Sequence, residues 1–296
     1  MKRPRLGLGD AGQRALLLAP YVIGVELLVL LPALFTFAVA FSEYDLLSDP
    51  SVTGFDNFTE LAGDPLFHRA LLNSLIFAAV VVPLRLFGAL SLALLLHRRF
   101  RGVGAARTAV YLPTVVPDVA YALLWLFLLN PLFGPINAIL GLIGLPQPAW
   151  LASEGGAMAA IILMSGFTIG EGFVVALAAR QELPQELYQL ARVEGSSALH
   201  TFRRVTLPLL APTLWLLAVR DTVFTLQISF VPAYILTDGG PDRATLFLPL
   251  LVFDNAFEWL RYGYAASMTL SMFILTALIV AVQFRLLRRW RFGLGR

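Results

Sequence analysis

The sequence predicts an all-α polytopic membrane protein with six transmembrane helices and both termini in the cytoplasm. The first observation is composition: of the 296 residues, 58% are hydrophobic and only 14% are charged, with a mean hydropathy of +0.77. Soluble domains carry about 25% charged residues. The second observation is that the basic residues gather in alternate segments between long apolar runs. We expect one transmembrane domain over residues 1–296.

Six apolar runs are long enough to cross a bilayer as helices, which takes about 20 residues each. They are residues 15–41, 71–96, 108–129, 157–179, 207–235 and 263–286. The first run is too long for the core of a signal peptide and has no clear small-residue cleavage site. We therefore expect it to be retained as a membrane anchor.

The segments between these runs set the orientation. Most of the basic residues lie in four segments, namely 1–14, 97–107, 180–206 and 287–296, the last taken with the end of the preceding run. The other segments are acidic or neutral and rich in Gly, Pro, Asn and aromatic residues: 42–70, 130–156 and 236–262. Because cytoplasmic segments carry the excess of Lys and Arg, the four basic segments are expected in the cytoplasm. On the outer side we expect a surface helix around Ile136–Ile143 and an interfacial amphipathic helix over Leu246–Trp259.

The stretch Pro184–Pro212 is the longest charged and polar run between apolar segments in the second half of the chain. It predicts two short amphipathic helices that meet at Gly195, forming a cytoplasmic elbow over 184–206. Ser196 or Ser197 can cap the second helix, and Leu207-Pro208 opens the next apolar run. An amphipathic element at a membrane surface is suited to docking another protein.

Charged residues also fall inside the apolar runs: Glu26, Arg85, Asp118, Glu171, Arg220 and Asp221. A charge that faces lipid costs several kcal/mol or has to reach the headgroups. Two interpretations stay open, because these residues could line a polar solute pathway or form ion pairs between helices. Arg85 is the hardest to explain as structural, since it lies near the middle of its run. Five prolines interrupt the predicted helices 108–129 and 207–235 and favour kinks: Pro113, Pro117, Pro208, Pro212 and Pro232.

Other kinds of site find no support. The chain has no Gly-x-x-x-x-Gly-Lys-Ser/Thr phosphate loop, so it does not hydrolyse ATP by that route. The three histidines, His68, His97 and His200, are far apart in sequence and predict no metal site. No nucleophile stands at a sensible spacing from a base, so catalysis is not predicted. The net charge of +3 is no sign of nucleic-acid binding, because the arginines serve topology.

The elbow carries a motif. It reads Pro184-x-Glu186-Leu187-Tyr188-x-x-Ala191-x-x-Glu194-Gly195-Ser196-Ser197, followed by Phe202-Arg203-Arg204-Val205-Thr206-Leu207-Pro208-Leu209-Leu210-x-Pro212. This run resembles the EAA signature, which marks the permease subunits of bacterial ABC importers. It departs from the signature where Gln189 replaces the leading glutamate, Leu190 replaces the following alanine and Glu194 replaces the aspartate before glycine.

Three further stretches resemble the sugar and glycerol-3-phosphate branch of the binding-protein-dependent permeases. The first is Tyr111-Leu112-Pro113 through Pro117, with Trp125-Leu126-Phe127, Asn130-Pro131 and Gly134-x-x-Asn137. The others are Thr237-x-Gly239-Gly240-Pro241 with Thr245, and Ala256-Phe257 with Gly263-Tyr264-Ala265-Ala266. The resemblance covers nearly the whole chain in order, although the aromatic motif of the fourth helix is reduced to Gly166-Phe167.

The resemblance implies a function and a set of partners. The elbow would dock in a cleft on a separate ATPase, through Glu186, Leu187, Gln189, Leu190, Ala191, Glu194, Gly195, Ser196 and Phe202. The partners would be a second, homologous permease subunit in a heterodimer, two ATPase subunits and an extracytoplasmic solute-binding protein. ATP and Mg would bind the ATPase, and this chain would bind no cofactor and no nucleic acid. The location would be a bacterial inner membrane, surrounded by lipid.

For the solute, the leading hypothesis is a di- or oligosaccharide or a related carbohydrate. Four acidic and two basic charges within the runs do not make an anion trap, which favours a neutral sugar. A permease for glycerol-3-phosphate or another polyol phosphate is the first alternative. An ion-coupled secondary transporter is the second, although such proteins commonly contain internal repeats and we find none here; a membrane enzyme is the weakest. The expected pathway residues are Arg85, Asp118, Glu171, Arg220, Phe224 and Gln227.

Overall fold

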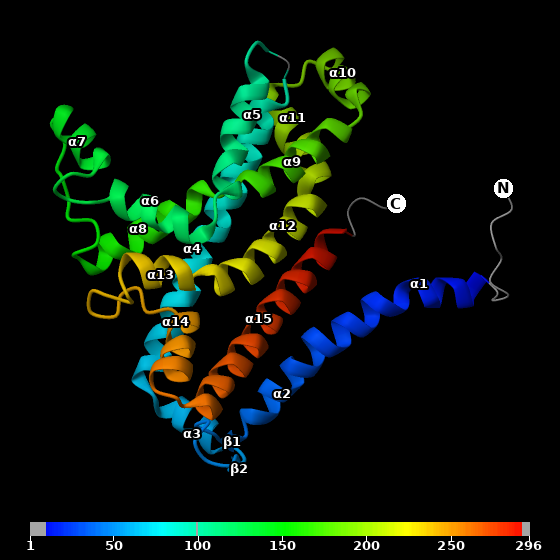
Figure 1. Cartoon of the computed structure of the whole chain (residues 1–296). Coiled ribbons are helices and arrows are strands. Elements are labelled where there is room, and N and C mark those ends of the chain that lie inside the picture. Colours follow the sequence, from blue (N-terminus) through cyan, green and yellow to red (C-terminus); the bar gives the residue numbers. More distant parts are fainter. Residues whose placement is uncertain (1–9, 99, 292–296) are drawn as a thin grey trace, which may run out of the picture. The chain divides into compact units, whose positions relative to one another are not determined.

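The computed structural model describes residues 10–98 and 100–291. Its regular structure is almost entirely helical, which confirms the all-α class (Figure 1). The sequence did not predict one small exception. Strands β1 (Ser42–Glu43) and β2 (Ser51–Val52) pair antiparallel, with Ser42 opposite Val52.

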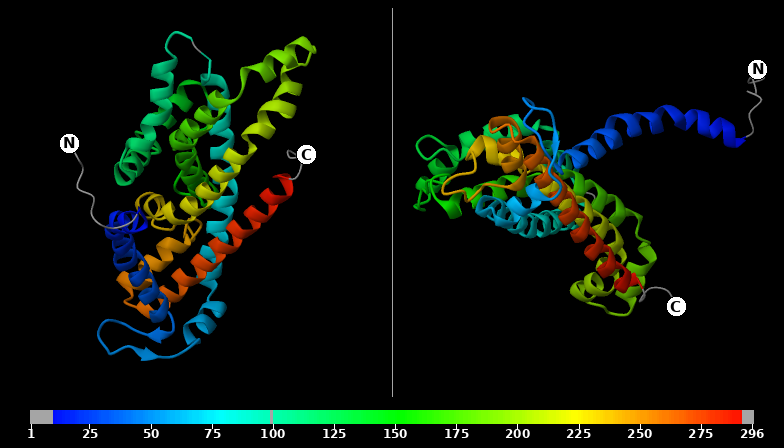
Figure 2. Two further views of the ribbon diagram at one scale, coloured as in Figure 1. Left: turned by 90° about the vertical axis from the view of Figure 1, so that its right-hand side faces the viewer. Right: turned by 90° about the horizontal axis from the view of Figure 1, so that it is seen from below.

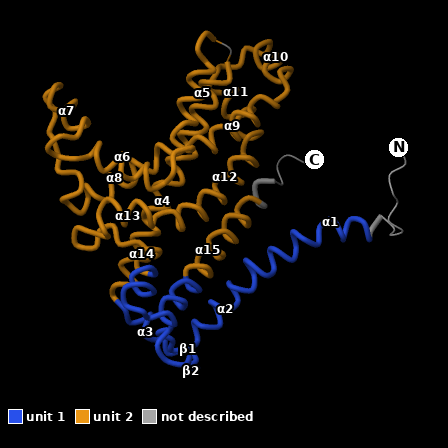
Figure 3. Tube along the Cα trace, in the orientation of Figure 1, with its two compact units in different colours: residues 1–64, 252–271 blue, residues 65–251, 272–296 orange. Residues whose placement is uncertain are grey.

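The chain packs as two compact units, which Figure 3 colours separately. Unit 1 comprises Met1–Asp64 and Val252–Ser271, and unit 2 comprises Pro65–Leu251 and Met272–Arg296. The expectation of a single domain over 1–296 stays a prediction.

Unit 1 begins with a long apolar helix. It is formed by α1 (Asp10–Val25), a π-helical turn η1 (Glu26–Leu30) and α2 (Leu31–Val39). None of the most apolar window of Gly12–Val39 is buried within the chain. A helix that is apolar and uncovered within its own chain is typical of a membrane span.

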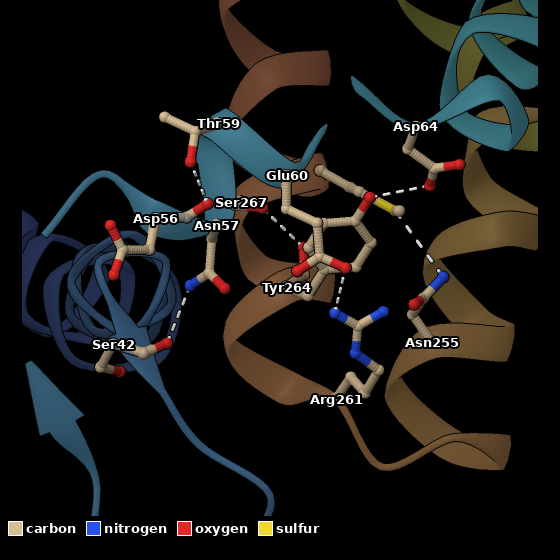
Figure 4. Close-up of polar contacts among 11 residues, drawn as sticks. Ser42, Asp56, Asn57, Thr59, Glu60, Asp64, Asn255, Arg261, Tyr264 and Ser267 are labelled. Atoms are coloured by element: carbon tan, nitrogen blue, oxygen red, sulfur yellow. Dashed lines mark hydrogen bonds and ion pairs between the residues drawn. The ribbon is translucent and has the colours of Figure 1, made fainter. Parts of the chain in front are cut away.

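The rest of unit 1 is a polar cluster around α3 (Asp56–Gly63), the π-helical turn η4 (Asp254–Glu258) and the start of α15 (Tyr262–Arg291), shown in Figure 4. The Asn57 side-chain amide donates to the Ser42 carbonyl at 2.9 Å, and the Tyr264 hydroxyl donates to Asp64 at 2.8 Å. A Cβ at position 263 would collide with the Ser42 carbonyl, so only glycine fits there. This contact gives a physical reason for the Gly263-Tyr264 pair.

Unit 2 is built on α4 (Pro65–Leu96). This helix packs against α8 (Glu154–Phe167), α9 (Gly170–Glu182) and α12 (Leu207–Ile228) (Figures 1 and 2). Small residues allow the close approach of helices, as is common in membranes. A Cβ at Gly166 would touch Leu84 at 2.9 Å, and one at Gly88 would touch Ile169 at 3.1 Å.

The outer loops of unit 2 are ordered by polar side chains. Helix α7 (Pro135–Leu142) confirms the helix expected around Ile136–Ile143, and its buried Asn137 accepts from the Trp150 indole at 2.8 Å. In the loop after α13 (Phe230–Leu236), the Thr245 hydroxyl lies 2.7 Å from the Thr237 hydroxyl. The helix expected over Leu246–Trp259 is formed by α14 (Leu248–Phe253) followed directly by η4. The buried leucines of α14 make it a packed element of the chain.

Two of the predicted spans are bent. The described chain has four single helices that could cross a membrane, Gly12–Val39, Pro65–Leu96, Ala198–Leu236 and Tyr262–Leu287, and up to six spans if each bent pair counts as one. The run predicted over 108–129 turns by 104° between Val103–Val115 and Asp118–Leu128. These pieces are α5 (Val103–Tyr111), the 3₁₀ turn η2 (Leu112–Val115) and α6 (Asp118–Leu128). The reason is Pro117, which forces the preceding residue into extended backbone and cannot continue a helix.

The run predicted over 157–179 turns by 42° between α8 and α9. No proline lies at this break, where Thr168 leaves the helical conformation with φ −87° and ψ 54°. The bend depends instead on a contact with α4, from which Arg85 donates a hydrogen bond to the Thr168 carbonyl.

The elbow is also corrected in one respect. Helix α10 (Gln185–Val193) is separate, but α11 (Ala198–Thr201), the π-helical turn η3 (Phe202–Thr206) and α12 run on without a break as part of the 39-residue helix Ala198–Leu236. The spanning helix therefore does not begin at Leu207-Pro208, where the apolar run opens, but at Ala198. Pro208 has no N–H to donate one turn back, and the π-helical turn precedes this point. The second arm of the elbow is thus the end of a spanning helix.

Candidate functional site

A cavity of about 170 Å³ lies within unit 2, at the break between α8 and α9. Residues from α4, α6, α9, α12 and α13 line it. Of the expected pathway residues, the structure brings five to this cavity: Arg85, Asp118, Glu171, Arg220 and Phe224. Gln227 is exposed on α12 and does not line the cavity. Asp221, another of the charges within the apolar runs, also lines the cavity, as do Tyr121 and Thr168, which the sequence had not singled out.

The charges of α9 and α12 meet across the cavity. Arg220 on α12 forms an ion pair with Glu171 on α9, and its other guanidinium nitrogen lies 3.5 Å from Asp221. The Arg220 guanidinium also stacks over the Phe224 ring, 5.0 Å from its centroid. Glu171 stands in the first turn of α9, where the helix dipole favours a carboxylate. Its side chain is 54% exposed, whereas that of Asp221 is only 6% exposed.

Arg85 explains the bend between α8 and α9. Its Nη2 donates to the Thr168 carbonyl at 2.6 Å, at the point where the helix breaks. The last carbonyls of a helix have no intrahelical partner and need donors from elsewhere. Tyr121 plays the same part from α6, donating its hydroxyl to the Met164 carbonyl at 3.1 Å. The charge that was hardest to explain from the sequence therefore binds the broken backbone.

The cavity as a whole carries more negative than positive charge. Two arginines, Arg85 and Arg220, face three carboxylates, Asp118, Glu171 and Asp221. Arg85 donates one hydrogen bond to a backbone carbonyl, while its Nε is buried without a partner among the described residues. Arg220 is paired with carboxylates. Asp118 opens α6 after Pro117 and makes no ion pair within the described part of the chain.

The elbow bends at Gly195, which has a φ of +72°. The Gly195 N–H donates to the Arg192 carbonyl at 3.0 Å and the Ser196 N–H donates to the Ala191 carbonyl at 2.9 Å. This pair of hydrogen bonds is a Schellman motif, which ends a helix with glycine in the left-handed region. Of the two serines that could cap the second helix, Ser197 does so by accepting from the His200 N–H.

One face of the elbow is apolar and uncovered. Leu190 is 61% exposed and Val193 86% exposed, with Leu187 and Leu199 also exposed. Most of the expected coupling residues lie open on it: Glu186, Leu187, Gln189, Leu190, Glu194 and Gly195. Ala191, Ser196 and Phe202 are half-buried. A cluster of exposed leucines at a surface element marks a contact surface.

Residues 86–292 match the family described as "Binding-protein-dependent transport system inner membrane component". The chain belongs to this family. It is accordingly the permease component of an ABC transporter, a multi-pass inner-membrane protein, and a transport subunit with no catalytic role of its own.

Two similar relatives extend over almost the whole chain of this permease. The "Probable ABC transporter permease protein YesP" of Bacillus subtilis is 31% identical over 92% of this chain and 89% of its own length. The "Sulfoquinovosyl glycerol transport system permease protein SmoG" of Agrobacterium fabrum is 30% identical over 96% of this chain and 92% of its own. Among solved structures, a bacterial ABC transporter that imports the acidic polysaccharide alginate superposes with a TM-score of 0.79 at 24% identity, covering 94% of this chain and 96% of that chain. This last likeness confirms the fold.

The next feature is the histidines of the permease, which the sequence did not predict to bind a metal. No group of His, Cys, Asp or Glu suited to a metal ion occurs within residues 10–98 and 100–291. His97 follows α4 and contacts the Leu94 carbonyl at 2.6 Å. Burial lowers the pKa of His97, and the charges of Arg180, Arg98 and Arg107 act in the same direction.

Two residues of the elbow region were missed from the sequence. Arg180 was counted only for topology, yet it is 7% exposed and lies 4.3 Å over the ring of Tyr188. Tyr188 stands inside the EAA-like motif, but its place in that motif gave no sign of what its side chain contacts. The motif fixes spacing along the helix and says nothing about the neighbouring helix.

Proposed function

We propose that this permease forms half of the pathway for a neutral carbohydrate of di- or oligosaccharide size. The observation that carries the proposal is the charge balance of the cavity. Arg220 is paired with Glu171, and three carboxylates face two arginines among the described lining residues, which disfavours a phosphate or carboxylate as the solute. Phe224 and Tyr121 add aromatic surface, and Thr168 and Ser165 add hydroxyls. Such a mixture of apolar faces and a few polar groups suits a sugar.

The names of relatives support a carbohydrate. They include a "Trehalose/maltose transport system permease protein MalF" of Thermococcus litoralis, 30% identical over 88% of this chain, and a "Lactose transport system permease protein LacF" of Rhizobium radiobacter, 30% identical over 91%. An sn-glycerol-3-phosphate permease of Agrobacterium fabrum is also similar, at 27% identity over 93%. The paired state of Arg220 argues for the sugar.

The assembly that we propose contains this chain, a second homologous permease, two ATPase subunits that bind ATP and Mg, and an extracytoplasmic solute-binding protein. The ATPase would dock on the exposed face of the elbow, through Leu187, Leu190 and the acidic Glu186 and Glu194. The uncovered helix Gly12–Val39 leaves apolar surface for lipid and for the second permease.

Competition for uptake tests the proposed solute. The complete assembly is reconstituted in proteoliposomes, and unlabelled maltose, trehalose, lactose and glycerol-3-phosphate are compared as competitors and as stimulators of ATP hydrolysis. We expect a neutral disaccharide to compete and to stimulate hydrolysis, and glycerol-3-phosphate to do neither. Stimulation by glycerol-3-phosphate alone would contradict the proposal and favour the polyol-phosphate alternative.

A further inference from the structure

Three residues at the base of the elbow join it to two other helices. The Arg180 guanidinium, in the last turn of α9, lies 4.3 Å over the ring of Tyr188 on α10. The Tyr188 hydroxyl lies 3.1 Å from the Thr206 hydroxyl, at the end of η3 where α12 begins. Tyr188 therefore contacts both of the helices that flank the elbow. We call Arg180, Tyr188 and Thr206 the elbow-base cluster.

The cluster is built into the protein and is not a surface contact. Arg180 is 7% exposed and Thr206 is 4% exposed. Two guanidinium nitrogens of Arg180, Nε and Nη1, are buried without a hydrogen-bond partner among the described residues. A buried cation needs compensation, and an aromatic face supplies it. The ring of Tyr188 is therefore what holds the Arg180 charge at this place, and the two side chains fix each other's position.

The same two helices meet again at the cavity. Helix α9 carries Arg180 near its end and Glu171 in its first turn, and the helix through η3 and α12 carries Thr206 and Arg220. Glu171 and Arg220 form the ion pair of the cavity. At a rise of about 1.5 Å per residue, Arg180 lies roughly 13 Å along α9 from Glu171, and Thr206 lies roughly 21 Å along its helix from Arg220. Helices α9 and α12 also pack directly against each other between these two points. A displacement of α10 at the cluster therefore acts on both of the helices that carry this ion pair.

We propose that Arg180 and Tyr188 are positioning residues that transmit movement of the elbow to α9 and α12, and so set whether the Glu171–Arg220 pair is closed. The inference rests on the proposed role of the elbow in docking the ATPase. It assigns a function to the inward face of α10, whereas docking uses the outward face. Neither Arg180 nor Tyr188 lines the cavity.

The first test measures coupling in the complete transporter, as ATP hydrolysed per solute imported. Arg180→Met removes the charge at similar length, Arg180→Lys keeps a cation for the ring, and Tyr188→Phe keeps the ring without the hydroxyl. Arg101→Met is the control, since it removes an exposed arginine from the α4–α5 turn. We expect the ratio of ATP hydrolysed to solute imported to rise about tenfold in Arg180→Met, with the ATPase still bound. In Arg180→Lys the ratio should stay close to the wild-type value, and in Tyr188→Phe it should be intermediate. The control should leave the ratio unchanged. An unaltered ratio in an assembled Arg180→Met transporter would overturn the inference.

The second test needs no transport and so separates this inference from the proposed function. The chain contains no cysteine, so two introduced cysteines can be labelled uniquely. Spin labels at the exposed positions Val175→Cys on α9 and Arg192→Cys on α10 report how firmly the two helices are joined. We expect a narrow distance distribution in the otherwise wild-type chain and a broad one after Arg180→Met. Equal widths would show that the cluster does not fix the elbow. If the distribution is narrow in the otherwise wild-type chain and broad after Arg180→Met, but the wild-type assembly imports no solute, the inference holds and only the proposed function is contradicted.

Discussion

At the scale of single residues, three of the six charges inside the apolar runs have two distinct roles. Arg85 binds the backbone of a broken helix, and Glu171 and Arg220 pair across a cavity. The sequence predicted that these charges face inward, because a charge against lipid is costly. It could not tell the roles apart, since the partner of Arg85 is a carbonyl that becomes free only when α8 ends. Every residue has a backbone carbonyl, so the residue types do not show which carbonyl lacks a partner within its helix.

The role of Arg85 gives a first prediction. In Arg85→Leu, the Thr168 carbonyl loses its donor, and we expect the free energy of unfolding to fall by about 1–3 kcal/mol. The measurement is the thermal unfolding temperature of the purified permease. Asp118→Asn is the control, because Asp118 lines the same cavity without an ion pair among the described residues. An unfolding temperature that falls no more in Arg85→Leu than in the control would contradict the capping role.

The pairing of Arg220 gives a second prediction, on selectivity. Glu171→Gln removes the partner from α9 and leaves Arg220 with Asp221. Because the pair is partly exposed, its loss should cost little stability, about 0–1 kcal/mol. We expect inhibition of uptake by glycerol-3-phosphate to strengthen roughly tenfold, which corresponds to about 1.4 kcal/mol of binding. Asp118→Asn should strengthen it less, and equal effects of the two variants would show that the pairing of Arg220 does not set the selectivity.

At the scale of elements, the sequence predicted where the helices lie better than how they run. Hydropathy shows how long an apolar run is but not whether its helix bends, so 108–129 and 157–179 each looked like one span. The 104° bend has a local cause in Pro117, which the sequence did offer as a kink. The 42° bend has a tertiary cause, because Arg85 on α4 satisfies the break at Thr168. In the elbow, the bend at Gly195 was predictable, whereas the continuity of α11 with α12 was not, since Leu207-Pro208 resembles a helix start.

The bend at Gly195 gives a third prediction. Apart from the two neighbouring residues, no atom in the described part of the chain lies within 4 Å of where a Cβ would stand, so a substitution there acts through the φ of +72°. A β-branched residue is strongly disfavoured in this region, whereas asparagine tolerates it. We expect Gly195→Val to lower uptake and solute-stimulated ATP hydrolysis together, and Gly195→Asn to keep most of both. If Gly195→Val leaves uptake and hydrolysis intact, the elbow geometry does not carry the coupling.

At the scale of the whole molecule, the sequence predicted the class, the order of the spans and the family. What it could not supply is the packing that turns scattered charges into a cavity. Arg85, Glu171 and Arg220 come from helices far apart in the sequence, and only the packing of α4, α9 and α12 brings them together. Gln227 shows the same limit, because the sequence predicted it as a pathway residue but it lies exposed on α12 and does not line the cavity.

The chain alone also leaves surfaces that need partners. The helix Gly12–Val39 has no buried residue in its most apolar window, and the elbow exposes Leu190 and Val193. The chain has no phosphate loop of its own, and we propose that a docked ATPase supplies the energy for transport. The central claim is therefore that solute crosses only when an ATPase acts on the elbow.

The most direct measurement is uptake of labelled disaccharide into proteoliposomes. One preparation contains both permeases, the ATPases and the binding protein, and the other contains the permeases and the binding protein alone. Each preparation is measured with and without internal ATP, and with an imposed proton or sodium gradient. We predict uptake only in the complete assembly and only with ATP, whatever the gradient. Uptake by the permeases without the ATPases, driven by an ion gradient, would contradict the claim and favour a secondary transporter.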